Sequence, residues 1–270
     1  MMRPGAGRVK LPPVLSAEAL RRALEAAGLE APVRYEREVG STNDLARQLA
    51  ARGAPEWTLV AAGHQTAGRG RIGRRWLDRP GQALLFSLVL RPRGLAPARA
   101  GLLSLMAGVA AAEASAAAGG PACRCKWPND LLVGGAKAGG ILAEALVERD
   151  ALRHVVLGVG LNLGETGPEV PGEPRPAGLG ALDPEAVLAA FLRAFHARYT
   201  PAHPAFPRAV LDAYRERSDT LGRRVRVEVS GGRAVTGLAV DLDDRGGLVV
   251  EGRDGRVTVS FGDVTHLREP

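Results

Sequence analysis

The chain has 270 residues, of which 46% are hydrophobic, and a formal net charge of +7. This length suits one main domain with a small second domain. No apolar run approaches the 18 residues of a membrane helix, and the N-terminal apolar run is too short for a secretory signal, which argues against membrane and secreted proteins. Cys123 and Cys125 are spaced poorly for a disulfide, so we expect a cytoplasmic protein.

The predicted elements alternate between helices and strands over the first four fifths of the chain. Ser16 can cap the first helix and Gly28 can end it. In chain order the patterns predict a loose segment over 1–15, a helix over 16–28, a strand over 33–39, a helix over 41–52, a strand over 57–63, a Gly-Arg loop over 68–75, a strand over 83–91, a helix over 98–118, strands over 123–127, 130–134, 138–148 and 153–163, a loop over 164–181, and helices over 183–199 and 204–217.

The pattern changes after Thr220. Four segments (RVRVEV, TGLAVDLDD, GLVVEGR and RVTVSFGDV) alternate apolar and polar residues between Gly and Asp turns, which predicts a small all-β unit. We place the boundary near Ser218, giving domains over 1–218 and 219–270. The predicted fold class is α+β, with a mixed β-sheet and flanking helices in the first domain.

The positive charge is carried almost entirely by arginine. Lys10, Lys126 and Lys137 are the three lysines among 36 basic residues. A GC-rich genome produces such a bias, so the basic charge alone does not establish a nucleic-acid partner. A lysine kept in this background is a candidate for chemistry that arginine cannot supply, because lysine is a compact charge that can lose its proton.

The loop GRGRIGRRW, which begins at Gly68, is the first motif with chemical potential. Its Gly-x-Gly-x-x-Gly pattern matches a dinucleotide fingerprint, but no helix follows the third glycine, so a Rossmann site is excluded by context. Glycines let backbone amides approach a phosphate, and arginines supply bidentate donors. The loop therefore predicts a clamp for a triphosphate or a carboxylate, the alternative being a solvated basic loop.

The segment KWPNDLLVGGAKAGGILAE, from Lys126 to Glu144, is the second motif. Asn129 and Asp130 are short polar groups suited to a metal–phosphate complex, and Lys137 precedes two glycines that leave room for a ligand. An ordinary β-hairpin with common turn residues is the alternative.

Two further motifs are weaker. In GVGLNLG at 158–164, closely spaced glycines would let a flat ligand lie against a strand, and Asn162 could contact an adenine edge. Ser41, Thr42 and Asn43 stand at a helix start, where they could either cap the helix or bind a urea-like group.

Taken together, these segments resemble the biotin protein ligases. The matching pieces are GSTNDLA from Gly40, GHQTAGRGRIGRRW from Gly63, the Lys126–Glu144 segment, and VVLGVGLNL from Val155, in the order of that family. The resemblance implies a catalytic domain like those of class II synthetases, a C-terminal SH3-like β-barrel, and the substrates biotin and ATP with Mg²⁺. It also implies transfer of biotin from biotinyl-AMP to a lysine of a biotin carboxyl carrier protein.

The resemblance also implies roles for individual residues. Biotin would contact Ser41, Thr42, Asn43, Gln65, Arg69, Gly70, Arg71 and Lys137. ATP would contact Arg69, Arg71, Trp76, Asn129, Asp130, Lys137 and Asn162. Lys137 and Arg71 would be catalytic, and Asp130 would lie near magnesium. The loop over Arg69 to Arg71 would become ordered when ligands bind.

Other interpretations stay open at this point. About 34 residues precede the first core strand, too few for the winged helix-turn-helix of bifunctional members, so we expect neither a repressor role nor specific DNA binding. A lipoate ligase is a related alternative. A basic RNA-binding protein is an alternative of another class, although only 4% of the residues are aromatic. A homodimer is compatible with the sequence, as is a monomer.

Overall fold

The computed structural model describes residues 15–164, 166–169, 175–229, 233–260 and 262–267. The predicted loose segment lies outside these residues, apart from Leu15. The larger unit contains these elements: α1 (Ala17–Ala26), β1 (Val33–Glu36), α2 (Thr42–Ala51), β2 (Leu59–Ala62), β3 (Ala83–Leu90), a 3-10 turn η1 (Pro97–Arg99), α3 (Gly101–Ala117), β4 (Arg124–Lys126), β5 (Asp130–Val133), β6 (Ala136–Glu148), β7 (Ala151–Asn162), α4 (Pro184–Arg198) and α5 (Phe206–Arg217). The predicted order of elements is confirmed, with ends that differ by a few residues.

The first helix shows how local chemistry sets the ends of an element. Ser16 caps α1 by accepting a hydrogen bond from the amide of Ala19 at 3.1 Å, as the sequence predicts. Leu20 and Leu24 are buried on its inner face. Gly28 follows with a φ of 72°, a conformation that ends helices at little cost for glycine.

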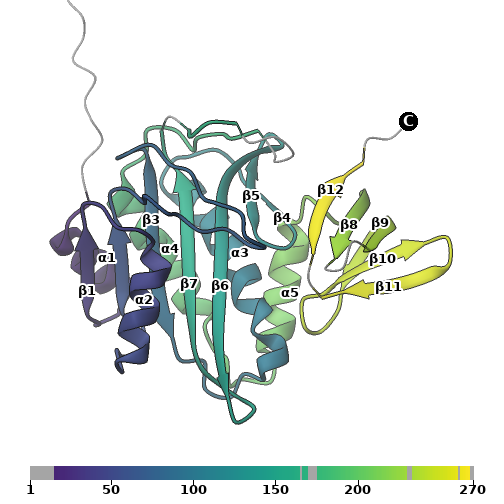
Figure 1. Ribbon diagram of the computed structural model, residues 1–270, viewed down its shortest axis with the longest axis horizontal. Helices are drawn as coiled ribbons and strands as arrows, with labels where there is room; N and C mark the ends of the chain where they lie inside the picture. Colours follow the sequence, from purple (N-terminus) through teal and green to yellow (C-terminus); the bar gives the residue numbers. More distant parts are fainter. Residues whose placement is uncertain (1–14, 165, 170–174, 230–232, 261, 268–270) are drawn as a thin grey trace, which may run out of the picture.

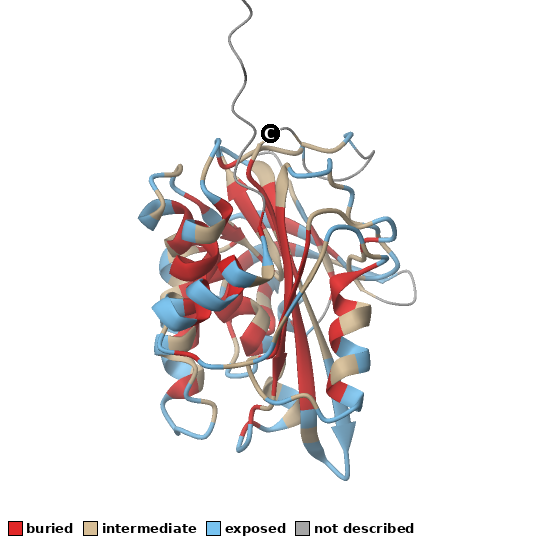
Figure 2. Ribbon diagram, turned by 90° about the vertical axis from the view of Figure 1, so that its left-hand side faces the viewer, coloured by how far each residue is buried: buried red, intermediate tan, exposed pale blue. Residues whose placement is uncertain are grey.

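The larger unit is a mixed seven-stranded sheet in the order β1-β2-β3-β7-β6-β5-β4. β1 and β2 are parallel, and the other neighbours are antiparallel. Helices α1, α3, α4 and α5 lie on one side, whereas α2 lies on the other, against β2, β3 and β7 (Figure 1). Figure 2 shows the buried strands between these two helical layers. The predicted mixed sheet with flanking helices is therefore confirmed.

Helix α3 is the central core helix. Together with η1 it forms a stretch, Pro97–Ala117, that is long and apolar enough to cross a membrane by length and composition, although it is not an uninterrupted apolar run. In the fold, 12 of the 17 residues of α3 are buried. It packs against α4, α5 and the strands β4 to β7. Its apolar surface is therefore covered by the protein itself.

The smaller unit is an antiparallel five-stranded sheet, as the SH3-like prediction requires. Its strands are β8 (Arg224–Val229), β9 (Arg233–Leu242), β10 (Leu248–Gly252), β11 (Gly255–Val259) and β12 (Asp263–His266). The order is β11-β10-β9-β8-β12. The segment RVTVSFGDV contributes to two strands, β11 and β12, which lie at opposite edges of the sheet. The predicted boundary near Ser218 falls between α5 and β8 and stays a prediction.

Candidate functional site

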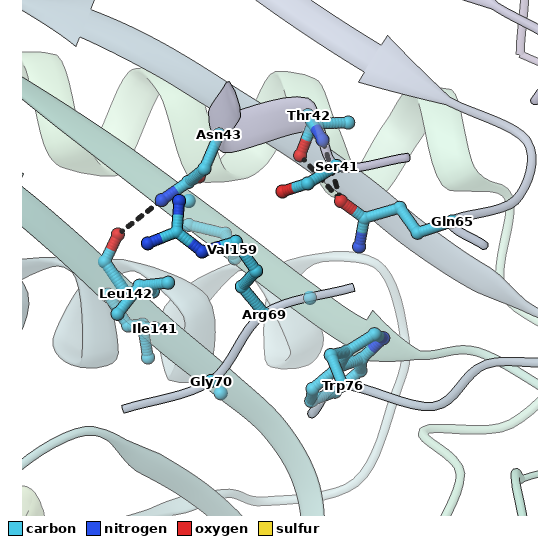
Figure 3. A pocket seen from close by; sticks show the side chains of 13 residues that line it. Ser41, Thr42, Asn43, Gln65, Arg69, Gly70, Trp76, Ile141, Leu142 and Val159 are labelled. Atoms are coloured by element: carbon cyan, nitrogen blue, oxygen red, sulfur yellow. Dashed lines mark hydrogen bonds between the residues drawn. The ribbon is translucent and has the colours of Figure 1, made fainter. Parts of the chain in front are cut away.

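A first pocket lies over β6 and β7, on the side of the sheet that carries α2 (Figure 3). Three structural pieces enclose it: the start of α2, the Gly-Arg loop, and the glycine-rich stretches of the two strands. It is lined by Ser41, Thr42, Asn43, Gln65, Arg69, Gly70, Trp76, Gly140, Ile141, Leu142, Gly158, Val159 and Gly160. Six of the eight residues predicted to contact biotin are among them.

The polar side chains of this pocket are held by one another. Gln65 Oε1 accepts from the amide of Thr42 at 2.7 Å and from its hydroxyl at 3.1 Å. Ser87 Oγ, fully buried on β3, lies 2.8 Å from Thr42 Oγ1 and donates to Asn43 Oδ1 at 2.6 Å. Asn43 Nδ2 donates to the carbonyl of Leu142 at 3.3 Å (Figure 3). A network fixed in this way presents donors and acceptors in one orientation.

The role of Ser41 distinguishes the two interpretations of this helix start. Ser41 occupies the N-cap position of α2, but its side chain makes no capping hydrogen bond. Gln65 instead accepts from the first-turn amide of Thr42. Capping therefore does not explain Ser41, and its side chain lines the pocket.

The Gly-Arg loop is folded as a tight hairpin, which we call the Gly-Arg hairpin (residues 68–76). The backbones of Arg69 and Arg75 form an antiparallel β-bridge across it, and the amide of Trp76 donates to the carbonyl of Gly68 at 3.0 Å. At its tip, Ile72 and Gly73 have φ values of 52° and 72°, and a type I′ β-turn requires positive φ at both of its central residues. The hairpin is thus held together by hydrogen bonds of its own backbone, and its ordering on ligand binding stays a prediction.

Arg69 anchors the hairpin to the sheet and to α2. Its guanidinium lies 2.5 Å from Asp44 Oδ1 and 2.5 Å from Glu144 Oε1. Burial lowers the pKa of Arg69, but the hydrogen bonds and charges of the two carboxylates outweigh burial and leave its pKa raised. Arg69 lines the first pocket, but its guanidinium is already paired with these two carboxylates.

Trp76 lies flat against the glycines of β6 and β7. Gly140 and Gly160 are paired across the two strands. A Cβ atom on Gly160 would lie 2.8 Å from Trp76 Cε2, and one on Gly140 would lie 3.3 Å from Cζ3. The sequence predicted a flat ligand on the glycines of 158–164; in the structure the indole of Trp76 lies against Gly160, and the contact with a ligand stays a prediction.

The indole limits the space in the first pocket. Trp76 Nε1 is buried without a hydrogen-bond partner within the described part of the chain. The free volume is about 50 Å³, far below the ~300 Å³ at which small-molecule pockets begin. Entry of a bicyclic ligand therefore requires the hairpin or the indole to shift, which would also give the orphaned N–H access to a partner.

A second pocket adjoins the first. Gly70 and Trp76 line both. Its remaining walls are the rest of the hairpin, the β4–β6 segment and the start of β12, namely Arg71, Ile72, Arg74, Arg75, Asn129, Asp130, Lys137, Gly262 and Asp263. Four cationic side chains face two carboxylates here, so the pocket is electropositive, and its free volume of about 40 Å³ means that a polyanion can enter only if the hairpin shifts.

The charged groups of the second pocket are partly buried and paired. Lys137 Nζ lies 3.0 Å from Asp130 Oδ1, and both side chains are largely buried. Arg71 Nη1 donates to Asn129 Oδ1 at 3.4 Å, while Asn129 Nδ2 donates to the carbonyl of Ile141 at 2.9 Å. Burial lowers the pKa of Arg71 and Asp130 opposes this, yet a guanidinium stays charged at neutral pH.

Asn162 lies apart from the predicted nucleotide contacts. Its side-chain amide donates to the carbonyls of Ala177 at 3.1 Å and Lys137 at 3.4 Å. It therefore fastens the segment around Ala177 to β6, and it does not line either pocket in the described part of the chain. Its predicted contact with adenosine is untested.

Three groups of the site were not predicted. Ser87 could have been found, because it is the one polar residue in the apolar strand ALLFSLVL. Glu144 ends the second motif and was not given a role. Asp263 lies in the C-terminal unit, far from the motifs, and its alternating strand gives no sign of a pocket residue.

The described residues contain no group of three or more His, Cys, Asp or Glu side chains arranged for a metal ion. Mg²⁺ is commonly held by one or two carboxylates together with substrate phosphates. Asp130, with Asn129 beside it, is the carboxylate that would fit this arrangement.

Comparison with known proteins agrees with the geometry. Residues 36–162 match the Biotin/lipoate A/B protein ligase family, and residues 220–267 match the Biotin protein ligase C terminal domain. The chain is 40% identical to the biotin–[acetyl-CoA-carboxylase] ligase of Mycobacterium tuberculosis over 86% of this chain and 87% of that protein. It is 31% identical to the bifunctional ligase/repressor BirA of Bacillus subtilis, over 97% and 82% of the two chains.

The fold gives a similar result. A biotin protein ligase from Aquifex aeolicus, solved in complex with biotin and ATP, superimposes with a TM-score of 0.70 at 26% identity. The match covers 88% of this chain and 99% of that one.

Proposed function

We propose, since this chain belongs to the biotin protein ligase family, that its first pocket binds biotin and its second pocket binds ATP. The chain is a ligase that activates biotin as biotinyl-AMP and transfers biotin to a carrier protein. One observation supports the assignment of the pockets above the others: Gly70 and Trp76 line both. Two substrates bound on either side of this shared wall would have their reacting groups next to each other, as adenylation requires.

The first pocket has the chemistry of a biotin head group. A ureido ring has a carbonyl acceptor and two N–H donors. The hydroxyl and amide side chains of the pocket include both donors and acceptors; they belong to Ser41, Thr42, Asn43 and Gln65. Ile141, Leu142 and Val159 supply apolar wall for the rest of the molecule. The second pocket has the cations that a triphosphate needs.

In the adenylation step, a carboxylate attacks the α-phosphate and pyrophosphate leaves. Both reactants are anions, so their approach is unfavourable without positive charge nearby. Lys137 and Arg71 lie in the second pocket and would offset this repulsion and stabilise the charge of the transition state. Magnesium, held by Asp130 and the phosphates, would neutralise further charge.

The Gly-Arg hairpin would exclude water from the mixed anhydride. Biotinyl-AMP is hydrolysed if water reaches it, and a closed cover prevents this. The hairpin is anchored by Arg69 on one side of the pockets and reaches the C-terminal unit on the other. The lysine amine of the carrier protein then attacks the acyl carbon, and AMP leaves.

The acceptor follows from the relatives. The Mycobacterium relative is named for acetyl-CoA carboxylase, and we propose that a lysine in the biotin carboxyl carrier protein of that enzyme accepts biotin here. We also propose a reducing, cytoplasmic location, because Cys123 and Cys125 are both free and buried. Homodimer formation and the absence of specific DNA binding stay predictions.

Exchange of radiolabelled pyrophosphate into ATP tests the proposal. Exchange should require biotin and Mg²⁺ and should not occur with lipoate or with neither acid. Arg71→Ala should impair it, whereas Arg208→Ala, which removes an arginine that is 88% exposed on α5, should not. Exchange supported by lipoate in place of biotin would reverse the assignment of the first pocket, and no exchange from folded protein would refute it.

A further inference from the structure

Within the described residues, an ion pair joins the Gly-Arg hairpin to the C-terminal unit. Arg74, next to the hairpin tip, pairs through Nη2 with Asp263 Oδ2 at the start of β12. Figure 1 shows the loop between β2 and β3 crossing in front of β7 and β6 towards β12. Because Arg69 anchors the other arm of the hairpin to α2 and β6, the hairpin is held at both sides of the two pockets.

The backbone of Arg74 is hydrogen-bonded to other residues of the hairpin. Its carbonyl accepts from the amide of Gly70 at 2.8 Å, and its own amide donates to the carbonyl of Arg71 at 3.0 Å. These hydrogen bonds close the turn that carries Arg71 into the second pocket. A displacement of Arg74 would therefore move both Gly70 and Arg71.

Asp263 lies between the second pocket and a groove at the surface of the C-terminal unit. Together with Ile72 and Arg74 it lines the second pocket on its inner side and a groove of about 400 Å³ on its outer side. The outer groove lies between the hairpin tip and strands β8 and β9, and includes Arg226 and Arg233. The Arg74–Asp263 pair is thus part of the barrier between the second pocket and the surface.

We propose that Asp263 is a positioning residue for the adenylate: it holds Arg74, and through it the hairpin, closed over the second pocket. This inference rests on the proposed function of the two pockets. It gives the C-terminal unit a specific task, the retention of biotinyl-AMP until an acceptor lysine arrives. Both side chains are somewhat over one-third exposed, so the pair should contribute little to folding stability.

The test compares two similar ion pairs between the units. Arg99 and Asp244 form the second, at 2.7 Å, away from both pockets. Preformed biotinyl-AMP complexes of the wild type, Asp263→Asn and Asp244→Asn are diluted, and release of the adenylate is followed. An exposed ion pair accounts for up to about fivefold in such an equilibrium, so release from Asp263→Asn should be about two- to fivefold faster, and release from Asp244→Asn unchanged.

Two further measurements separate positioning from a structural defect. The KM for ATP should rise in Asp263→Asn with little change in kcat, because the defect lies in closure and not in the reacting groups. The conservative variant Asp263→Glu, which keeps a carboxylate for Arg74, should restore slow release, and the thermal melts of all variants should coincide. Equal release from Asp263→Asn and the wild type, or equal acceleration in both single variants, would overturn the inference. If the wild type itself forms no biotinyl-AMP, the proposed function fails instead.

Discussion

Lys137 works next to a carboxylate and close to a second lysine. Its Nζ lies 3.0 Å from Asp130 Oδ1. Burial lowers the pKa of Lys126, and the charge of Lys137 lowers it further while Asp130 opposes both. Asp130 therefore balances two ammonium groups in a partly buried place. A phosphate brought into this group would meet positive charge that is already desolvated, which strengthens the attraction.

Lys137 should not be replaceable even by arginine. A compact ammonium can sit between a carboxylate oxygen and a phosphate oxygen, whereas a planar guanidinium is wider and would displace one of them. Losing one well-placed charge contact to a transition state costs about 3–4 kcal/mol, on the order of a few hundred-fold in rate. Lys137→Arg and Lys137→Ala should both lose about this factor in single-turnover adenylation. Near-normal adenylation by Lys137→Arg would show that only the charge matters.

Ser87 should control biotin affinity without touching the reacting atoms. Ser87→Ala removes the donor to the buried Asn43 Oδ1, and an unsatisfied buried acceptor costs about 1–3 kcal/mol. The Kd for biotin, measured by calorimetric titration, should rise by about tenfold. Ser115→Ala is the matched control, because Ser115 is an equally buried serine that donates to the carbonyl of Pro121 outside the pockets. It should lower stability but leave the Kd unchanged, and a similar Kd change in both variants would contradict the assignment.

At the scale of elements, sequence patterns predicted much of the site because the relevant signals are local. The start of α2 follows from the polar run Ser41, Thr42 and Asn43, although Ser41 makes no capping hydrogen bond, and the strands β6 and β7 follow from turns and apolar runs. The pairing of Gly140 with Gly160 does not, because it depends on the register of two strands. Neither does the position of Trp76 on these glycines, nor the contact of Arg74 with Asp263, since both join segments far apart in the chain.

The packing of Trp76 against Gly140 and Gly160 should be sensitive to a single added methyl group. In Gly160→Ala the new Cβ would lie 2.8 Å from Trp76 Cε2, so the indole must move. Overpacking of this kind costs about 1–3 kcal/mol, and biotin affinity should fall by about tenfold. Gly101→Ala, where the Cβ would meet its nearest neighbour at 3.8 Å in the first turn of α3, is the control and should bind biotin normally. Normal biotin binding by Gly160→Ala would mean that the indole moves away from Gly160 when biotin binds.

At the scale of the whole molecule, the two units meet around the short edge strand β4. Trp127 Nε1 donates to the carbonyl of Gly246 at 2.9 Å, and the backbone amide of Trp127 donates to Thr220 Oγ1 at 2.9 Å. Arg124 donates to the carbonyl of Ser218 at 2.7 Å. The KWPND motif therefore has two tasks: its polar end enters the second pocket, and its tryptophan fastens the C-terminal unit next to that pocket.

This junction also makes stability depend on pH through His266. Its Nε2 lies 3.3 Å from Thr220 Oγ1, and its Nδ1 lies 3.6 Å from Asp219 Oδ2. Burial lowers the pKa of His266 to about 4; repulsion from Lys126 and Arg223 adds to this effect and Asp219 opposes it. Between pH 6.5 and 4 the unfolded chain therefore binds a proton that the folded chain does not. The resulting contribution to stability is present above pH 6.5 and is lost as the pH falls towards 4.

Urea unfolding at pH 7.0, 5.5 and 4.5 would measure this effect. A shift from 6.5 to about 4 corresponds to about 3 kcal/mol over the whole window. His266→Gln keeps a side-chain amide near Thr220 but cannot take up a proton, so its free energy of unfolding should fall less between pH 7.0 and 4.5 than that of the wild type. His203→Gln, which changes an exposed histidine before α5, should keep the wild-type slope. If all three proteins lose stability in parallel, other groups carry the pH dependence and the junction is not its source.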